Sequence, residues 1–490
     1  MPDIKYVCLS DMHLGAENSL LTKLSLDGLK KDFSAPSQVL ISLVDGIRKL
    51  ISFNQDQTRK PTLILLGDIL ELALAETQEA GMVFDQFIDL IFPKGDELFE
   101  EVFYIPGNHD HHLWEIARES QYIKYIQRKT NKDLLPEMWH TTNIFIEDDP
   151  FPTHCDFMTA IVQNKDHLKN RMVKVAYPNF GILSNDTKSA VILHHGHFLE
   201  DIYLLMSTMN TTIFPNQKMP EIIWDIEKEN FAWIDFFWSA MGRSGNAGRG
   251  VELIYDKMTD EKKFSELLKN IATKIVESLK AKEKEEAGSF WKKIILFLVG
   301  FIPGRSQIKI VYGILKLTLG FIAKQERSDS EDSMSDEMRN KLVSYLDVTL
   351  FKQLIAEKNE TAPKEIQFVF GHTHKPFAET FSNSKSYVKP INLVNTGGWV
   401  VDTVERKDTC GGAVVLIDEN LNIAPVCMYK ESSTENEPLP GILPGAISNP
   451  FVIRIQELIS NNRENFESFS KLADREIELR IVNLKAKINA

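Results

Sequence analysis

Short apolar segments recur along the chain, and each of them ends in a polar or glycine-containing turn. They are four to six residues long and rich in β-branched and aromatic residues, which is typical of buried strands. Five of them are Ile4–Leu9, Thr62–Leu66, Glu101–Ile105, Ala190–Leu193 and Ile366–Phe370. Segments with helical periodicity, such as 38–51 and 82–91, lie between the first strands. Alternating strands and helices predict an α/β fold, in which ligands bind beyond the carboxyl ends of the strands.

The regular spacing of strands stops after residue 197. From about residue 201 to 364 the pattern is mostly helical, which indicates a long insertion. Strand patterns return at 366 and continue over residues 391–394, 413–417 and 424–429. A stretch rich in Ser, Glu and Pro at 432–450 predicts a linker, and an amphipathic helix is expected over about 451–488. We therefore expect a core in two parts, 1–200 and 365–430, an insertion at 201–364, and a linker with a C-terminal helix at 431–490.

The length of 490 residues exceeds one ordinary core and predicts more than one structural unit. With 69 acidic and 56 basic residues, the net charge is −13. An acidic protein can bind nucleic acid only through a local basic patch or through metals, so nucleic acid is not an expected partner. The four cysteines have no short paired spacing, which fits a reducing compartment. The first residues show no signal-peptide pattern, and no stretch reaches the ~18 uncharged residues of a membrane-spanning helix. A cytoplasmic location is expected.

Five of the turns carry aspartate, histidine or asparagine at the point where a predicted strand ends. They are Asp11-Met12-His13, Gly67-Asp68, Gly107-Asn108-His109-Asp110, His195-Gly196-His197 and Gly371-His372-Thr373-His374. Oxygen and imidazole ligands together suit Mn, Fe or Zn, and the lack of thiolates argues against a structural zinc site. A single turn of this kind is usually structural, but five in succession after five strands favour a metal centre.

Two adjacent divalent metals can activate a water and hold the oxygens of a phosphoryl group at the same time. Such a pair needs a carboxylate that bridges both ions. Asp68 is the natural candidate, because its turn lies between the others. His194 and His195 are neighbours, so only one of them can point to the metals from a strand end.

The same five motifs, complete and in order, resemble those of the calcineurin-like metallophosphoesterases, and the resemblance covers about residues 1–200 and 365–430. It implies a four-layer α/β/β/α sandwich, here with a long, mostly helical insertion and a C-terminal helix. It also implies two metal sites, formed by Asp11, His13, Asp68 and His374 for one ion and by Asp68, Asn108, His195 and His372 for the other. His195 is preferred to His194 because the family's ligand is followed by glycine.

By the same resemblance, His109 is the catalytic histidine, which contacts the phosphate and assists the leaving group. The substrate contacts that we expect are Asn108, His109 and His197. In the family's protein phosphatases, the acid three residues after the bridging aspartate orients the catalytic histidine, and Glu71 holds that position here. The alternative for Glu71 is an exposed glutamate in the first turn of a helix.

The sequences Gly371–Pro376 and Asn395–Trp399 look most like bacterial members of the family, and the group around UDP-2,3-diacylglucosamine hydrolase is the nearest that we can name. Those enzymes cleave a pyrophosphate in a lipid precursor. This chain departs from them, because it has His109 where they carry an arginine and His197 where they carry an aspartate, and its insertion is much longer. The substrate is therefore not carried over from that group.

Residues 289–325 of the insertion contain no Asp or Glu, although the whole chain is acidic. Long apolar runs are combined there with Lys292, Lys293 and a flanking Trp291, and Pro303-Gly304 interrupts them. This composition suits a helical hairpin in peripheral contact with the inner face of a membrane, and it also suits a hydrophobic lid over a lipid substrate. An ordinary helical pair packed on the core is the third interpretation.

The leading hypothesis is thus a phosphoesterase with two divalent metal ions, Mn, Fe or Zn. It would hydrolyse a phosphomonoester, a phosphodiester or a pyrophosphate by a metal-activated water, and a lipid-linked substrate fits this hypothesis. A nuclease of the same family is the second hypothesis, which the charge of −13 disfavours. A binding or scaffold protein without catalysis is the third, but such proteins usually lose metal ligands and none is missing here. The oligomeric state is not predicted.

Overall fold

The computed structural model describes residues 2–129, 134–146, 152–213, 216–235, 333–432 and 439–489, together with residues 239, 265 and 269. The chain divides into two compact units, residues 1–245 with 332–490 and residues 246–331. Nearly all of the described residues belong to the first unit, which contains both sheets. Among the described helices, none is long and apolar enough to cross a membrane.

Two β-sheets form the centre of this unit. The eight-stranded sheet has the order β13-β12-β11-β1-β2-β3-β5-β4, and the five-stranded sheet has the order β6-β7-β8-β10-β9. Parallel pairing joins β1, β2, β3 and β5 in the first sheet and β7, β8 and β10 in the second. The strands are β1 (Ile4–Leu9), β2 (Thr62–Leu66), β3 (Glu101–Ile105), β4 (Thr153–His154), β5 (Val173–Val175), β6 (Asn179–Leu183), β7 (Ser189–His194), β8 (Glu365–Phe370), β9 (Phe377–Phe381), β10 (Ile391–Asn395), β11 (Gly411–Asp418), β12 (Ile423–Lys430) and β13 (Gly441–Ile442).

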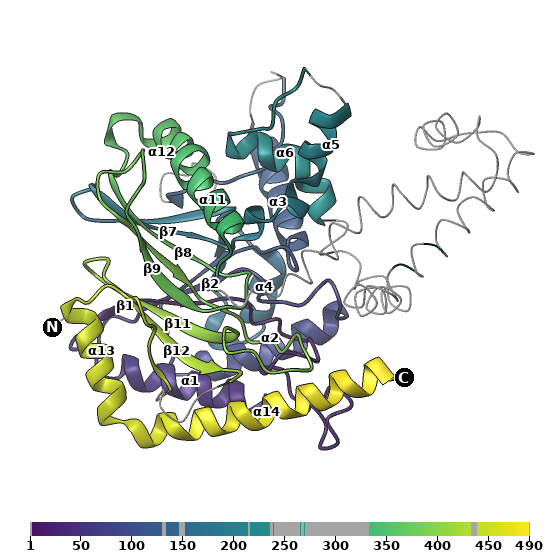
Figure 1. Cartoon of the computed structure of the whole chain (residues 1–490), viewed down its shortest axis with the longest axis vertical. Coiled ribbons are helices and arrows are strands. Elements are labelled where there is room, and N and C mark those ends of the chain that lie inside the picture. The colour runs from purple at the N-terminus through teal and green to yellow at the C-terminus, as the bar shows by residue number, and fades with distance from the viewer. Residues whose placement is uncertain are drawn as a thin grey trace, which may run out of the picture. The chain divides into compact units, whose positions relative to one another are not determined.

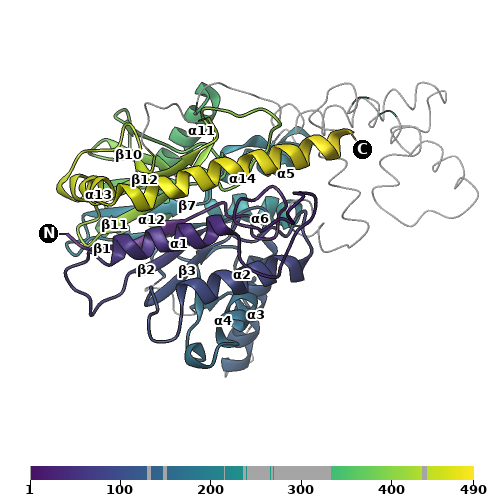
Figure 2. The same cartoon turned by 90° about the horizontal axis from the view of Figure 1, so that it is seen from below.

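Helices cover the outer faces of both sheets, which gives four layers (Figures 1 and 2). The helices are α1 (Gln38–Ile51), α2 (Thr77–Ile91), α3 (His112–Arg128), α4 (Asp156–Gln163), α5 (Leu205–Ile213), α6 (Ile223–Ile234), α11 (Asp336–Ser344), α12 (Phe351–Lys358), α13 (Pro450–Asn461) and α14 (Arg463–Asn489). Buried residues of α1 to α4, α13 and α14 form one core with the eight-stranded sheet. The segment of α11 and α12 lies over the five-stranded sheet, where Tyr345 packs against Phe368 of β8.

The helix α1 illustrates how the sequence specifies an outer layer. The side chain of Ser37 caps it by accepting a hydrogen bond from the Leu40 N–H at 3.0 Å. Its apolar residues recur every three or four positions and are buried against the sheet: Val39, Leu40, Leu43, Val44, Ile47 and Leu50. A second core lies between the two sheets, where apolar side chains of β1, β2 and β3 meet those of β6, β7, β8 and β10.

The predicted α/β class, two sheets with helices on their outer faces, is confirmed. The expected C-terminal helix is divided into α13 and α14, because Asn462 leaves the helical conformation with φ −117° and ψ 28°. The expected linker contains β13, which pairs with β12. The described parts of 201–364 are helical in α5, α6, α11 and α12. Residues 289–325 lie outside the described residues, so the membrane hairpin, the lid and the packed pair all stay predictions.

Candidate metal centre

The five polar turns meet at one end of the two sheets. The strands β1, β2 and β3 carry the first three turns, and β7 and β8 carry the other two. The backbone N–H of His13 donates to the carbonyl oxygen of Asp68 at 2.9 Å, which joins the turns after β1 and β2. The backbone N–H of His372 donates to the carboxylate of Asp11 at 2.8 Å, which joins the two sheets. Candidate ligands far apart in the sequence are therefore held together by main-chain hydrogen bonds.

Within the part of the chain that the structure describes, carboxylate and imidazole groups approach each other closely enough to hold metal ions in three places. The groups are Asp11, His13 and His374; Asp68, His195 and His372; and His13, Glu71 and His109, with one ligand atom from each residue within 4.8 Å of the others. We call the first group the first metal site and the second group the second metal site. Among the described residues, the buried Oδ2 of Asp11 and Nε2 of His13 have no hydrogen-bond partner, as expected of atoms that face a cation. This set of oxygen and nitrogen donors fits Mn, Fe or Zn.

Asp68 lies between the two metal sites. Its Oδ2 is 3.2 Å from Nε2 of His195 and 3.8 Å from Nε2 of His13. Burial raises the pKa of Asp68, but His195 and His109 lower it by more, and the pKa falls well below its usual range. Nε2 of His195 is also 3.0 Å from Oδ1 of Asn108, so the structure places the asparagine beside the second metal site. This carboxylate therefore lies close to candidate ligands of both sites.

The backbone of the centre adopts an unusual conformation. Five candidate ligands have φ angles between 43° and 72°, namely Asp11, His13, Asp68, His372 and His374. Residues other than glycine enter this left-handed region at a cost of about 1–3 kcal/mol each, and they cluster at functional sites. The motif glycines are needed for a different reason, since a Cβ on Gly107 or Gly371 would collide with the carboxylate of Asp68 or Asp11.

Glu71 connects the first metal site to the expected catalytic histidine. It is buried and precedes α2, so it does not lie exposed in the first turn of a helix. Its Oε2 is 2.8 Å from Nδ1 of His13, and its Oε1 is 3.0 Å from Nδ1 of His109. Burial raises the pKa of Glu71, but the two histidines lower it far below its usual range. Because an ionised carboxylate only accepts hydrogen bonds, both Nδ1 atoms carry a proton, and both Nε2 atoms remain free to act elsewhere.

His109 combines partial exposure with a high proton affinity. Its side chain is 18 % exposed, whereas that of Glu71 is 2 % exposed. Burial lowers the pKa of His109, but Glu71 and Asp68 outweigh this effect and raise the pKa to about 10. A histidine that is protonated at neutral pH can donate a proton to a leaving group.

Sequence reasoning did not identify two further acids of the centre. Oδ2 of Asp402 lies 2.7 Å from Nδ1 of His374, and Oε2 of Glu200 lies 3.4 Å from Nε2 of His372. Carboxylates in such positions fix the orientation and tautomer of a ligating imidazole. Asp402 follows Trp399 by three residues, so its nearness to a motif was the available signal. Glu200 is the last residue before the expected insertion and gave no signal.

Asp110, the last residue of its motif, fastens the turn after β3 to the turn after β2. Its carboxylate accepts hydrogen bonds from the backbone N–H groups of Gly107 at 2.7 Å and Ile69 at 2.8 Å. Burial and the neighbouring Asp68 raise the pKa of Asp110 to about 6. Asp110 belongs to the third motif, but the sequence did not indicate what its carboxylate would contact.

The histidines of the fourth turn point in different directions. His195 faces Asp68, whereas His194 packs against Tyr345, between α11 and α12, and against Phe368 of β8. His197 is fully buried, and its Nε2 lies 3.4 Å from the hydroxyl of Tyr177. The expected contact of His197 with substrate stays a prediction.

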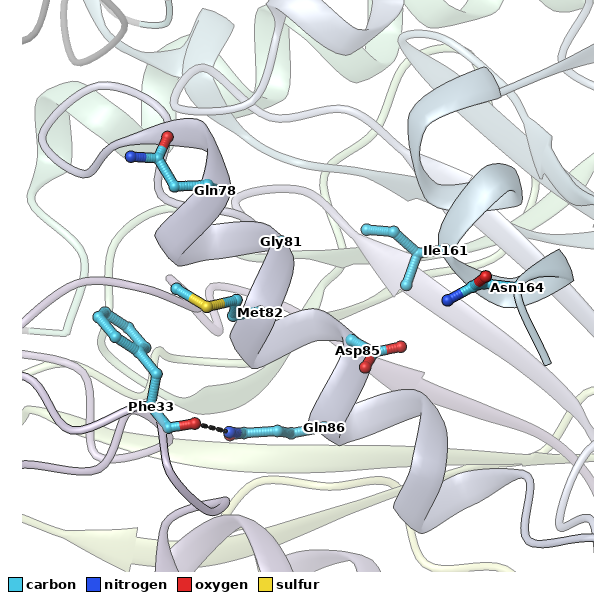
Figure 3. Close-up of a pocket in the computed structure, with 8 residues that line it drawn as sticks. All are labelled: Phe33, Gln78, Gly81, Met82, Asp85, Gln86, Ile161 and Asn164. Atoms are coloured by element: carbon cyan, nitrogen blue, oxygen red, sulfur yellow. Dashed lines mark hydrogen bonds between the residues drawn. The ribbon is translucent and has the colours of Figure 1, made fainter.

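A surface pocket of about 400 Å³ lies elsewhere, between α2 and α4 (Figure 3). Its lining residues are Phe33, Gln78, Gly81, Met82, Asp85, Gln86, Ile161 and Asn164. In Figure 3 the side chain of Gln86 donates a hydrogen bond to the carbonyl oxygen of Phe33, at 2.8 Å. None of these residues belongs to the three metal-binding groups, so this pocket does not carry the chemistry of the centre.

Comparison with known families agrees with this geometry. The sequence model of the calcineurin-like phosphoesterase family matches residues 4–238. This match to the calcineurin-like phosphoesterases spans just under half of the chain and contains the first four turns, and the turn at 371–374 lies beyond it. No curated protein matches the chain. The family match and the candidate ligand groups together support a metal-dependent phosphoesterase, while the likeness to UDP-2,3-diacylglucosamine hydrolase stays a prediction.

Proposed function

We propose that this chain is a phosphoesterase with two divalent metal ions, which hydrolyses a phosphomonoester, a phosphodiester or a pyrophosphate. The position of Asp68 carries the proposal, because one carboxylate oxygen lies within 4 Å of imidazole nitrogens from both metal sites. Ions held there would supply an activated water and positive charge for the phosphoryl oxygens. Asp11, His13 and His374 would hold one ion, and His195, His372 and Asn108 would hold the other, with Asp68 shared.

The proposed role of His109 is to protonate the leaving group. Its Nδ1 donates to Glu71, so the ring is oriented with Nε2 turned away from that carboxylate. The backbone N–H of His109 donates to Oδ1 of Asp68 at 2.8 Å, which fixes the residue beside the shared ligand. Glu71 and Asp68 also favour the protonated ring, as a general acid requires. Glu71 therefore serves as an orienting residue for the acid.

The test is reconstitution of the metal-free full chain with Mn²⁺, Fe²⁺ or Zn²⁺, followed by assays on three substrates. These are p-nitrophenyl phosphate, bis-p-nitrophenyl phosphate and single-stranded DNA. We expect metal-dependent hydrolysis of at least one nitrophenyl ester and about two ions bound per chain. Cleavage of DNA alone would favour a nuclease. Two bound ions without any hydrolysis would favour a binding protein, and no metal binding would contradict the proposal altogether.

We also propose that the substrate carries a lipid tail, and this proposal is tested separately. Lipid that copurifies with the chain should be extracted and identified by mass spectrometry. A phosphorylated or pyrophosphorylated lipid, depleted after the protein is incubated with metal, would support a lipid-linked substrate. Hydrolysis that is confined to small water-soluble esters would contradict it.

A further inference from the structure

Three fully buried polar side chains form a chain behind the second metal site. They are Glu227 of α6, Tyr177 after β5, and His197, and each is 0 % exposed. The hydroxyl of Tyr177 lies 3.4 Å from Nε2 of His197. Burial raises the pKa of Tyr177, and the adjacent Glu227 raises it further, so that the hydroxyl keeps its proton. The three residues therefore connect a helix of the region 201–364 to the turn that carries His195.

Glu227 is unfavourable for folding in this position. Within the described part of the chain, neither of its carboxyl oxygens has a hydrogen-bond partner of normal geometry. Burial raises the pKa of Glu227 well above its usual range, and Tyr177 and Arg118 offset only part of this effect. Arg118 is already engaged, because its Nε donates to Glu115 at 2.5 Å. A buried acid of this kind usually destabilises a fold relative to an apolar residue.

Packing alone does not account for an acid at this place in α6. The other inward-facing residues of the helix are mostly apolar, namely Ile223, Ile226, Phe231 and Ile234, beside the hydrogen-bonded Asn230. A leucine at position 227 would continue this pattern. The acid therefore contributes something other than core packing, and the groups that interact with it are the Tyr177 hydroxyl and the Arg118 guanidinium.

At the other end, His197 packs directly against His195 and, through Tyr203, reaches His372. Its ring centroid lies 5.7 Å from that of His195 and 5.6 Å from that of Tyr203. The ring of Tyr203 lies 5.3 Å from that of His372. A shift of the His197 ring would thus move the rings of His195 and His372, the two imidazoles that lie next to Asp68.

We propose that Glu227 is a positioning residue of the second metal site, which acts through Tyr177 and His197 on His195. This inference rests on the proposed function, because it takes Asp68, His195 and His372 as the ligands of a cation. If the inference holds, α6 is a part of the metal centre, although this helix belongs to the region 201–364 between the two halves of the core. Glu227 touches no reacting atom in this scheme, and its effect is exerted on metal affinity.

The experiment compares Glu227→Leu, Tyr177→Phe and the double variant with the wild-type full chain. Asp225→Leu is the matched control, since it places a leucine on the exposed face of the same helix. Mn²⁺ is titrated into the metal-free proteins by calorimetry, and thermal melting is recorded without metal. We expect each single variant to weaken one of the two equivalents of Mn²⁺ by ~10-fold and to leave the other unchanged, at the lower end of the usual effect of outer-shell partners. The double variant should lose no more than the stronger single variant, because both residues act in one pathway.

Thermal melting separates positioning from packing. The melting temperature of Glu227→Leu should equal or exceed that of the wild type, because an unpaired buried acid is removed. Glu227→Gln should retain most of the metal affinity, since its amide resembles the protonated acid. Unchanged binding in either single variant, additive losses in the double variant, or a parallel loss of both equivalents and of thermal stability would each overturn the inference. A wild-type chain that binds only one ion would overturn the proposed function as well, whereas two ions with unaltered variants would overturn this inference alone.

Discussion

Replacing Glu71 by glutamine should weaken the first metal site and leave His109 largely in place. Glutamine has nearly the same shape, but only one of its two terminal atoms accepts hydrogen bonds. Oε1 of Glu71 accepts three, from the backbone N–H groups of Ala73 and Leu74, both at 2.9 Å, and from Nδ1 of His109 at 3.0 Å. Oε2 accepts one, from Nδ1 of His13 at 2.8 Å. The amide oxygen should therefore take the Oε1 position, and the amide NH2 group should face His13.

The amide NH2 group and the Nδ1–H of His13 would then be two hydrogen-bond donors that face each other. It can avoid this conflict by moving its proton from Nδ1 to Nε2, but a protonated Nε2 cannot bind a metal ion. A hydrogen bond to a charged group contributes about 1.5–3 kcal/mol. Since every 1.4 kcal/mol is tenfold in affinity, metal binding at the first site should fall by about 10- to 100-fold.

The assay is calorimetric titration of the metal-free Glu71→Gln protein with Mn²⁺. Glu119→Gln, at an exposed position of α3, is the control for the loss of one carboxylate. The rate at saturating Mn²⁺ should fall less than the affinity, because His109 keeps its acceptor. Wild-type affinity for both equivalents would refute the reasoning about His13. A large loss of rate at saturating metal with unchanged affinity would show that the amide had turned the other way.

Four further predictions concern single residues of the centre. Asp68→Asn should remove most bound metal and nearly all hydrolysis, measured by elemental analysis and turnover. Asp45→Asn, at an exposed position of α1, is the control, and normal metal content in Asp68→Asn would contradict the two-metal proposal. His109→Ala should keep about two ions, and its rate of hydrolysis should fall by ~10²–10⁴. The fall should be smallest on p-nitrophenyl phosphate, whose leaving group needs no proton. Equal falls on substrates with good and poor leaving groups would assign His109 to phosphate binding instead. Asp402→Asn should weaken the ion held by His374 by ~10- to 100-fold in a Mn²⁺ titration, and an unchanged titration would exclude an orienting role. Gly371→Ala should also weaken that ion, because the added Cβ collides with Asp11, and full affinity would mean that the turn can relax.

The parts of the structure that sequence could predict are those with a long local pattern. The runs 4–9, 62–66 and 101–105 are β-branched and aromatic, and β1, β2 and β3 have these bounds. Parallel strands present their carboxyl ends at one edge, so the meeting of Asp11, Asp68 and Asn108 followed from the strand assignments. Short strands such as β4 and β5 have two or three residues, too few to show any period.

Other features depend on contacts that no local pattern records. Asp402 meets His374 across 28 residues of chain, and Glu71 divides its oxygens between two histidines from separate turns. The division of the C-terminal helix at Asn462 is also not visible as a break in apolar periodicity. These features arise when segments pack against each other, which is why the motifs gave the ligand candidates and Glu71, but neither the second contact of Glu71 with His13 nor the carboxylates of Asp402 and Glu200.

The pairing of β7 with β8 has a consequence for how such a chain can diverge. The two strands are parallel neighbours in register, from Ser189 opposite Glu365 to His194 opposite Phe370. Parallel neighbours need a crossover connection, for which a dozen or more residues would suffice. Doubling the length of a flexible connection costs only about 0.6 kcal/mol, so the sheet tolerates great variation there. Beyond the stretch that carries Glu227, this connection can thus change in length while the ends of β7 and β8, with the adjacent His195 and His372, keep their positions.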